Sequence, residues 1–151
     1  MKIAVFPGSF DPITKGHEDI IRRALPMFDE IVVGIGYNST KHYFFSQNSR
    51  EHFIKKTIEG ESKIKVMRYQ GLTINFCREI NAKYIIRGLR TSADFEFERV
   101  IAQMNHSMAP DVETVFLVSS PALSHISSSV VRDILSHQGD ISTFVPSAVH
   151  V

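Results

Sequence analysis

Short apolar segments alternate with segments of helical periodicity along the chain. The apolar runs are rich in Ile, Val, Phe and Tyr, and most of them lack polar residues at alternate positions. Such runs are typical of strands buried on both faces, as in a parallel sheet that helices cover. The pattern therefore predicts five strands, at residues 2–6, 30–36, 64–69, 83–87 and 114–118.

Between these runs, apolar residues recur at steps of three and four, the spacing that places side chains on one face of a helix. Alternating strands and helices predict an α/β fold, a doubly wound five-stranded parallel sheet in a single domain of residues 1–151. Ligands of such folds bind where strand carboxyl ends meet helix amino ends. The apolar helix faces consist of Ile20, Ile21, Ala24 and Leu25, of Phe97, Val100, Ile101, Met104 and Met108, and of Val130, Val131, Ile134 and Leu135.

The composition narrows the functional classes. The net charge is only +1, whereas binding a nucleic-acid backbone by bulk charge needs a cationic excess, so we expect no nucleic-acid partner. The single cysteine, Cys77, has no disulfide partner within the chain, and we interpret it as a packing residue. No segment approaches the roughly 20 apolar residues of a membrane span. We therefore expect a cytoplasmic protein without membrane contact.

The loop that follows the first predicted strand has features of a phosphate site. Gly8 permits close backbone approach, Ser9 offers a hydroxyl, and His17 lies at the start of a helix, whose amino end attracts anions. An ordinary strand–helix connection is the alternative, since Asp11 and Pro12 are common turn residues. Neither of the usual glycine-rich phosphate loops occurs in the chain.

Two arginines lie at the carboxyl end of the fourth predicted strand. Arg87 and Arg90 suit two separate phosphates, because guanidinium groups bind phosphate bidentately and keep their charge. The alternative is a set of surface ion pairs with Asp94, Glu96 or Glu98. The spacing alone leaves both interpretations open.

Three consecutive serines, Ser127, Ser128 and Ser129, open the last predicted helix. Serine is a good helix cap, and the free N–H groups of a first helical turn bind phosphate. Capping needs only one serine, so simple capping and phosphate binding both remain open at this point.

The string Thr14-x-Gly16-His17 resembles the T/H-x-G-H signature of the nucleotidyltransferase superfamily. The serine segment, residues 126–132, is similar to that superfamily's I-S-S-[ST]-x-x-[RK] motif, which contacts ATP phosphates. The resemblance implies a Rossmann-like nucleotidyltransferase fold and the chemistry of nucleotidyl transfer.

Two longer strings, residues 7–17 and 86–98, resemble one branch of the superfamily, the phosphopantetheine adenylyltransferases, and the likeness extends from Lys2 to about His150. That family transfers the adenylyl group of ATP reversibly to 4′-phosphopantetheine, giving dephospho-CoA and pyrophosphate in coenzyme A biosynthesis. The resemblance implies the same reaction here and assembly into a homohexamer. It also implies Mg²⁺ held mainly by phosphates and water, and the histidines show no metal-ligand spacing.

The resemblance implies roles for individual residues as well. His17, Lys41 and Arg90 are the expected catalytic residues. The acceptor is expected to contact Ser9, Lys41, Thr73 and Arg87. Contacts with ATP are expected from Ser9, Phe10, His17, Gly88, Leu89, Arg90, Glu98, Leu123, Ser124, His125, Ile126, Ser127, Ser128 and Ser129.

Some positions depart from the family pattern. Ser9 stands where many members have Thr, which keeps the hydroxyl, and Leu123 stands where many carry an aromatic residue near the adenine. Thr73 replaces a larger apolar residue of some relatives. Two other functions stay open: a cytidylyl- or nicotinamide-mononucleotide-type transferase, and a catalytically silent nucleotide-binding module.

Overall fold

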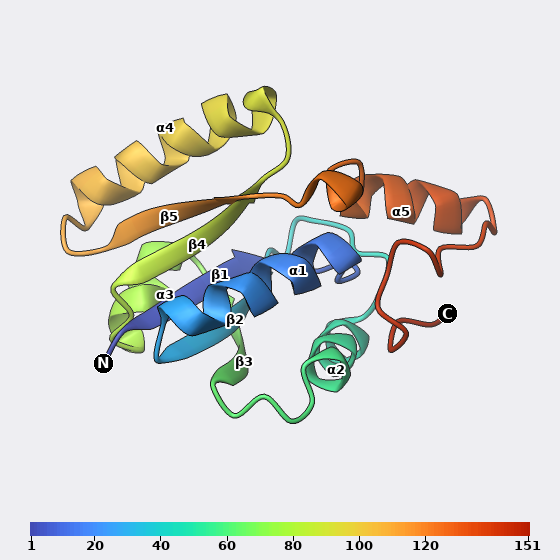
Figure 1. Ribbon diagram of the computed structural model, residues 1–151, viewed down its shortest axis with the longest axis horizontal. Helices are drawn as coiled ribbons and strands as arrows, with labels where there is room; N and C mark the ends of the chain where they lie inside the picture. Colours follow the sequence, from blue (N-terminus) through green and yellow to red (C-terminus); the bar gives the residue numbers. More distant parts are fainter.

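A computed structural model describes all residues, 1–151, and contains one parallel sheet with helices around it (Figure 1). The strand order is β3-β2-β1-β4-β5, and every neighbouring pair is parallel. The predicted fold class and all five predicted strands are confirmed. The strands are β1 (Ile3–Gly8), β2 (Glu30–Tyr37), β3 (Ile64–Gln70), β4 (Tyr84–Leu89) and β5 (Glu113–Val118).

The central strand β1 explains why the apolar runs lack polar alternation. Its residues point alternately to two hydrophobic cores, one on each face of the sheet. Ala4 and Phe6 belong to the larger core, and Ile3 and Val5 belong to the smaller one. The smaller core also holds Cys77, and burial raises the pKa of its thiol to about 11, as expected for a packing residue.

Five α-helices flank the sheet. Helices α1, α2 and α5 contribute to the larger core, and α3 contributes to the smaller one. The apolar faces predicted for the first and last helices are buried at Ile20, Ile21, Val131 and Leu135, whereas Val130 is exposed. The helices are α1 (Lys15–Ala24), α2 (Gln47–Thr57), α3 (Thr73–Glu79), α4 (Ser92–Met108) and α5 (Ser128–Ser136), with 3₁₀ turns η1 (Leu25–Met27) and η2 (Pro121–Leu123).

Helix α4 departs from the expectation that each apolar helix face covers the sheet. Figure 1 shows it running beside β4 and β5, away from α1 and α2. Phe97 is 68% exposed and Met104 is 61% exposed, and the one buried residue of the helix is Glu98. The periodicity correctly predicts a helix. It does not specify what covers the apolar face, and in this chain each of the five residues of that face is at least 39% exposed.

Candidate active site

Two adjoining cavities open at the carboxyl end of the sheet. The first, called the α5 cavity, has a volume of about 340 Å³ and lies between the loop after β1, the end of β4 and the amino end of α5. The second, called the α4 cavity, has a volume of about 390 Å³ and lies between the ends of β2, β3 and β4 and helix α4. Their common wall consists of Pro7, Gly8, Ser9, Lys41, Arg87 and Glu98.

Most residues predicted from the sequence lie in these linings, so the three candidate segments converge on one place. The α4 cavity is lined by all four residues predicted to contact the acceptor substrate: Ser9, Lys41, Thr73 and Arg87. Four predicted ATP contacts, Leu89, Leu123, Ser124 and His125, lie outside both linings, and their roles stay predictions. The α5 cavity is lined by Ser9, Phe10, His17, Gly88, Arg90, Glu98, Ile126, Ser127, Ser128 and Ser129.

The imidazole of His17 is held by the helix cap that it helps to form. Thr14 is the N-cap of α1, and its Oγ1 accepts a hydrogen bond from the His17 N–H at 3.3 Å. In return, Nδ1 of His17 accepts from the Thr14 backbone N–H at 3.0 Å. A backbone N–H can only donate, so Nδ1 carries no proton and the neutral ring has its proton on Nε2. The capping and ligand-binding interpretations of this histidine are therefore compatible.

The charge of His17 is set by its surroundings. Burial, followed by the nearby charges of Arg87 and Arg90, lowers the pKa of the imidazole from 6.5 to about 4. At neutral pH the side chain is thus an uncharged donor in a wall that also carries cations. The main cause of this shift is burial, and the two arginine charges add to it.

Phe10 supports the imidazole instead of presenting its ring to the cavity. The residue is 2% exposed, and its ring makes an edge contact with His17, with centroids 5.0 Å apart. Gly8 makes room for it, because a Cβ at that position would lie 3.1 Å from the Phe10 ring. The ring is therefore packed into the protein, and the predicted contact of Phe10 with ATP stays a prediction.

The predicted ion pairs of the two arginines are confirmed, and both residues also line the α5 cavity, so phosphate binding stays a prediction that the ion pairs do not contradict. Arg87 binds Glu98 with two hydrogen bonds, Nε to Oε2 at 3.0 Å and Nη2 to Oε1 at 2.7 Å. Its Nη1 donates to the Pro7 carbonyl at 2.8 Å. Nε of Arg90 lies 3.4 Å from a carboxylate oxygen of Asp94. Three of the five guanidinium N–H groups of Arg87 are thus committed, and two remain for a ligand.

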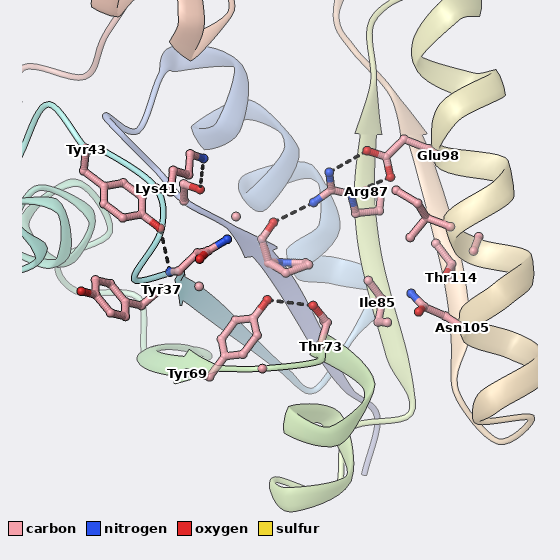
Figure 2. Close-up of a pocket in the computed structure, with 18 residues that line it drawn as sticks. Tyr37, Lys41, Tyr43, Tyr69, Thr73, Ile85, Arg87, Glu98, Asn105 and Thr114 are labelled. Carbon is pink, nitrogen blue, oxygen red and sulfur yellow. Dashed lines mark hydrogen bonds and ion pairs between the residues drawn. The ribbon is translucent and has the colours of Figure 1, made fainter.

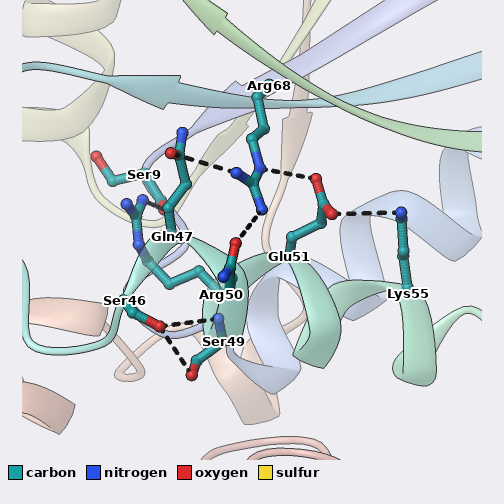
Figure 3. Close-up of polar contacts among 9 residues, drawn as sticks. Ser9, Ser46, Gln47, Ser49, Arg50, Glu51, Lys55 and Arg68 are labelled. Atoms are coloured by element: carbon teal, nitrogen blue, oxygen red, sulfur yellow. Dashed lines mark hydrogen bonds and ion pairs between the residues drawn. The ribbon is translucent and has the colours of Figure 1, made fainter.

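Lys41 comes from the loop between β2 and α2, and its Nζ donates to the Ser9 Oγ at 2.9 Å. That loop is fixed by two buried charged residues with no obvious sequence signal. Both carboxylate oxygens of Asp11 accept backbone N–H groups of the loop, at 2.7 and 2.9 Å. Arg50 donates to the Ser9 carbonyl at 2.8 Å (Figure 3). It also donates to the Phe45 carbonyl at 3.2 Å. Lys41 is therefore held next to the loop after β1.

The three serines at the start of α5 make different hydrogen bonds. Ser127 is the N-cap, and its Oγ accepts from the Val130 N–H at 3.2 Å. Ser128 donates its hydroxyl to the Pro12 carbonyl at 3.0 Å, which ties α5 to the loop after β1. Arg132 strengthens that tie, because its Nη1 donates to the Asp11 carbonyl at 2.9 Å. Ser128 and Ser129, whose N–H groups belong to the first turn and have no carbonyl partner within the helix, line the α5 cavity.

Several residues of the α4 cavity were not predicted from the sequence. Tyr37 and Tyr69 lie at the carboxyl ends of β2 and β3, and Asn105 comes from α4 (Figure 2). The rule that ligands bind at strand carboxyl ends points to both tyrosines. Nothing in the helical periodicity of α4 distinguishes Asn105 from a solvated polar residue.

Comparisons with known proteins place this geometry in a family. The cytidylyltransferase-like family model matches residues 5–134. The phosphopantetheine adenylyltransferase of Christiangramia forsetii is 54% identical over 149 residues, covering 99% of this chain and 98% of that protein. The enzyme of the same name from Flavobacterium johnsoniae is 52% identical over 151 residues, covering 100% and 99%.

Solved structures agree on the fold. A putative nicotinate-nucleotide adenylyltransferase from Vibrio parahaemolyticus is similar with a TM-score of 0.72 at 21% identity, covering 98% of this chain and 96% of that one. A bifunctional NMN adenylyltransferase/ADP ribose pyrophosphatase from Francisella tularensis reaches a TM-score of 0.75 at 15% identity, and the match covers 98% of this chain and 46% of that one.

No helix here has the length and apolar character that crossing a bilayer requires. By its full-length matches and its family model, the chain belongs to the phosphopantetheine adenylyltransferases, within the cytidylyltransferase-like family.

Proposed function

We infer that this chain catalyses the reaction for which its family is named, the reversible transfer of the adenylyl group of ATP to 4′-phosphopantetheine with release of pyrophosphate. The products are dephospho-CoA and pyrophosphate, which makes the reaction a step of coenzyme A biosynthesis. The observation that carries this inference is the common wall of the two cavities. There, Lys41 and Arg87 lie between a cavity with phosphate-binding features and a second cavity that can hold an acceptor.

The charges in the α5 cavity suit a nucleophile that needs no general base. A phosphate monoester has its second pKa near 6, so the acceptor is already largely a dianion at neutral pH. Each carboxylate of this lining is already engaged: Asp11 by backbone N–H groups, Glu98 by Arg87, and Asp94 by Arg90. The site therefore works by positioning and by stabilising negative charge.

We assign the roles as follows. ATP lies in the α5 cavity with its phosphates against Arg90 and the first turn of α5, and the acceptor lies in the α4 cavity. Lys41 and the two uncommitted N–H groups of Arg87 hold the acceptor phosphate in line with the α-phosphorus. His17 donates its Nε2 proton in a hydrogen bond to an α-phosphoryl oxygen, where charge accumulates in the transition state.

Mg²⁺ fits this arrangement as a cofactor held mainly by the phosphates and by water. The carboxylates of the α5 cavity are paired with N–H groups or guanidinium groups, and no group of three His, Cys, Asp or Glu side chains is arranged to hold a metal. An ion bound mostly by substrate phosphates is the usual mode for Mg²⁺. When bound, it would offset phosphate charge and leave the protein residues to orient the reactants.

We also propose that the chain works in the cytoplasm as a homohexamer. The apolar residues of α4 supply the support for self-association. Phe97, Val100, Ile101, Met104 and Met108 lie on one side of the helix and are all at least 39% exposed. An apolar stripe of this kind on a monomer usually marks a contact with another chain.

A pyrophosphate-release assay with a panel of acceptors tests the proposed reaction. We expect turnover with ATP and 4′-phosphopantetheine and little or none with ATP and nicotinamide mononucleotide. Turnover with the mononucleotide alone would replace this function with that of a related transferase. Binding of ATP without pyrophosphate release from any acceptor would instead indicate a catalytically silent module.

A further inference from the structure

A pair of hydroxyl groups lies in the wall of the α4 cavity, on the side opposite Lys41. Oη of Tyr69 and Oγ1 of Thr73 are 2.8 Å apart, and both residues line the cavity. Thr73 is a predicted acceptor contact, whereas no motif or role accounts for Tyr69. In Figure 2 this pair lies at one end of the lining residues, and Lys41 with its bond to Ser9 lies at the other.

The tyrosine ring has a fixed position. It stacks on Phe76 with centroids 4.5 Å apart and an interplanar angle of 7°. Its other neighbours are glycines of β2, where a Cβ at Gly34 would lie 3.1 Å from the ring and a Cβ at Gly36 would lie 3.5 Å from it. The bare backbone of β2 and the ring of Phe76 therefore orient Tyr69 so that its hydroxyl meets Thr73. Because the ring cannot move freely, the Tyr69 hydroxyl has a fixed position and can bind only a ligand group that lies in line with it.

Counting protons shows what this pair offers a ligand. Tyr69 and Thr73 each have one O–H, and their mutual hydrogen bond uses one of the two. Burial raises the pKa of the Tyr69 phenol, so it keeps its proton at neutral pH. One O–H donor and several oxygen lone pairs therefore remain. The nearby lining includes the side chains of Ile85 and Ile101, which are apolar and offer a ligand no hydrogen bond. A polar group of a ligand at this place would therefore bind the free O–H.

A neutral polar group of an acceptor at this end of the cavity would pair with the free O–H. A phosphate at Lys41 and Arg87 occupies the other end, so the group belongs to the arm that extends from the phosphate. An amide matches the pair best, because its carbonyl can accept the free O–H and its N–H can donate to a hydroxyl oxygen. The arm of 4′-phosphopantetheine contains amide groups.

We propose that Tyr69 is a specificity-determining residue, which together with Thr73 recognises an amide in the arm of the acceptor. This inference rests on the proposed function, since it places the acceptor in the α4 cavity. It assigns the hydroxyl pair to acceptor binding and assigns it no part in the transfer step. Its signature is a change in acceptor KM without a change in kcat or in the KM for ATP.

The test replaces Tyr69→Phe, which removes only the hydroxyl and keeps the ring stacked on Phe76. Loss of one hydrogen bond to a neutral group should raise the KM for 4′-phosphopantetheine about three- to tenfold, with kcat within about twofold of wild type. Thr73→Val should have a similar effect. The double variant should lose less than the product of the two single effects, because the residues act as a pair. Tyr84→Phe, which removes a tyrosine hydroxyl outside both cavities, is the matched control.

A second acceptor separates arm recognition from a general disturbance of the site. An alkyl phosphate without amide groups should be used equally poorly by wild type and Tyr69→Phe. Equal KM values for 4′-phosphopantetheine in wild type and both single variants would overturn this inference and leave the family reaction intact. A fall in kcat with the alkyl phosphate would also overturn it. Wild-type protein that fails to turn over 4′-phosphopantetheine would instead overturn the proposed function.

Discussion

The imidazole of His17 has both its charge state and its tautomer set by neighbouring groups. The Thr14 N–H occupies Nδ1, so the ring proton is on Nε2. The edge of the Phe10 ring contacts the imidazole, and burial disfavours its protonated form. The side chain is thus prepared to donate one hydrogen bond without reorganisation, which is the arrangement that stabilises a developing negative charge most effectively.

This arrangement predicts the titration of His17. Its folded pKa of about 4 lies below the unfolded value of 6.5, so the unfolded chain binds the extra proton first as the pH falls. The free energy of unfolding should therefore decrease from pH 6.5 towards pH 4 more steeply in wild type than in His17→Asn. Imidazole ¹⁵N NMR should show a neutral ring with its proton on Nε2 at pH 7 and no titration above about pH 5. A midpoint near 6.5 would contradict this account.

Removing the imidazole should impair the transfer step. Loss of one well-placed donor in a site of this kind costs about 3–4 kcal/mol of transition-state stabilisation, so His17→Ala should lower kcat about 10²- to 10³-fold. Steady-state kinetics measure the effect, with His137→Ala, an exposed histidine outside both cavities, as control. A kcat within a few-fold of wild type would remove His17 from the catalytic residues.

Individual residues were predictable from the sequence where they belong to short motifs. His17, Arg87 and the serines lie at the ends of predicted strands or at the starts of predicted helices. Their side chains can bind phosphate, and these are the places where an α/β fold binds its ligands. Asp11 and Arg50 were not predictable as a unit, since their shared function is to hold a loop through contacts between residues far apart in sequence. Buried charges of this kind become visible only when the fold brings their partners together.

At the scale of elements, different serines at the amino end of α5 have the capping role and the proposed ligand-binding role. Ser127 caps the helix, whereas the Ser129 hydroxyl contacts only Arg132, at 3.3 Å. Ser127 therefore has the predicted capping role, and Ser129 is the residue left for the proposed contact with phosphate. Capping and phosphate binding are compatible because the cap uses one N–H and leaves others free.

Two single substitutions should separate these functions. Ser127→Ala should lower the free energy of unfolding by about 1 kcal/mol, because it removes the N-cap. Ser129→Ala should change stability by less than about 0.5 kcal/mol and should raise the KM for ATP. Urea unfolding and steady-state kinetics on both variants measure the two effects, and each variant is the control for the other. The reverse pattern would contradict the assignment.

The strands were predictable because burial on both faces leaves a continuous apolar run. The strand predicted at residues 2–6 is Ile3–Gly8, and the one predicted at 64–69 is Ile64–Gln70. Helix α4 marks the limit of this reasoning. Its periodicity predicts an apolar face, but a periodic pattern contains no information on whether the same chain or another one covers that face.

At the scale of the whole molecule, the exposed apolar face of α4 predicts self-association. Met104→Lys places a charge in the stripe, so it should lower the sedimentation mass from about six times 17.1 kDa towards a smaller species. Gln103→Lys adds the same charge to a polar exposed position of α4 and should leave the assembly unchanged. A wild-type chain that sediments as a monomer would contradict the hexamer.

The common wall between the cavities limits the number of chemical steps. With ATP and the acceptor placed in the two cavities as proposed, the reactants meet at this wall, so the bond to the incoming oxygen can form while the bond to the departing oxygen breaks. No side chain has to carry AMP in between, and the one hydroxyl side chain of the wall, that of Ser9, is hydrogen-bonded to Lys41. A single in-line displacement inverts the configuration at phosphorus. A chirally labelled α-phosphate should therefore have the inverted configuration in the product.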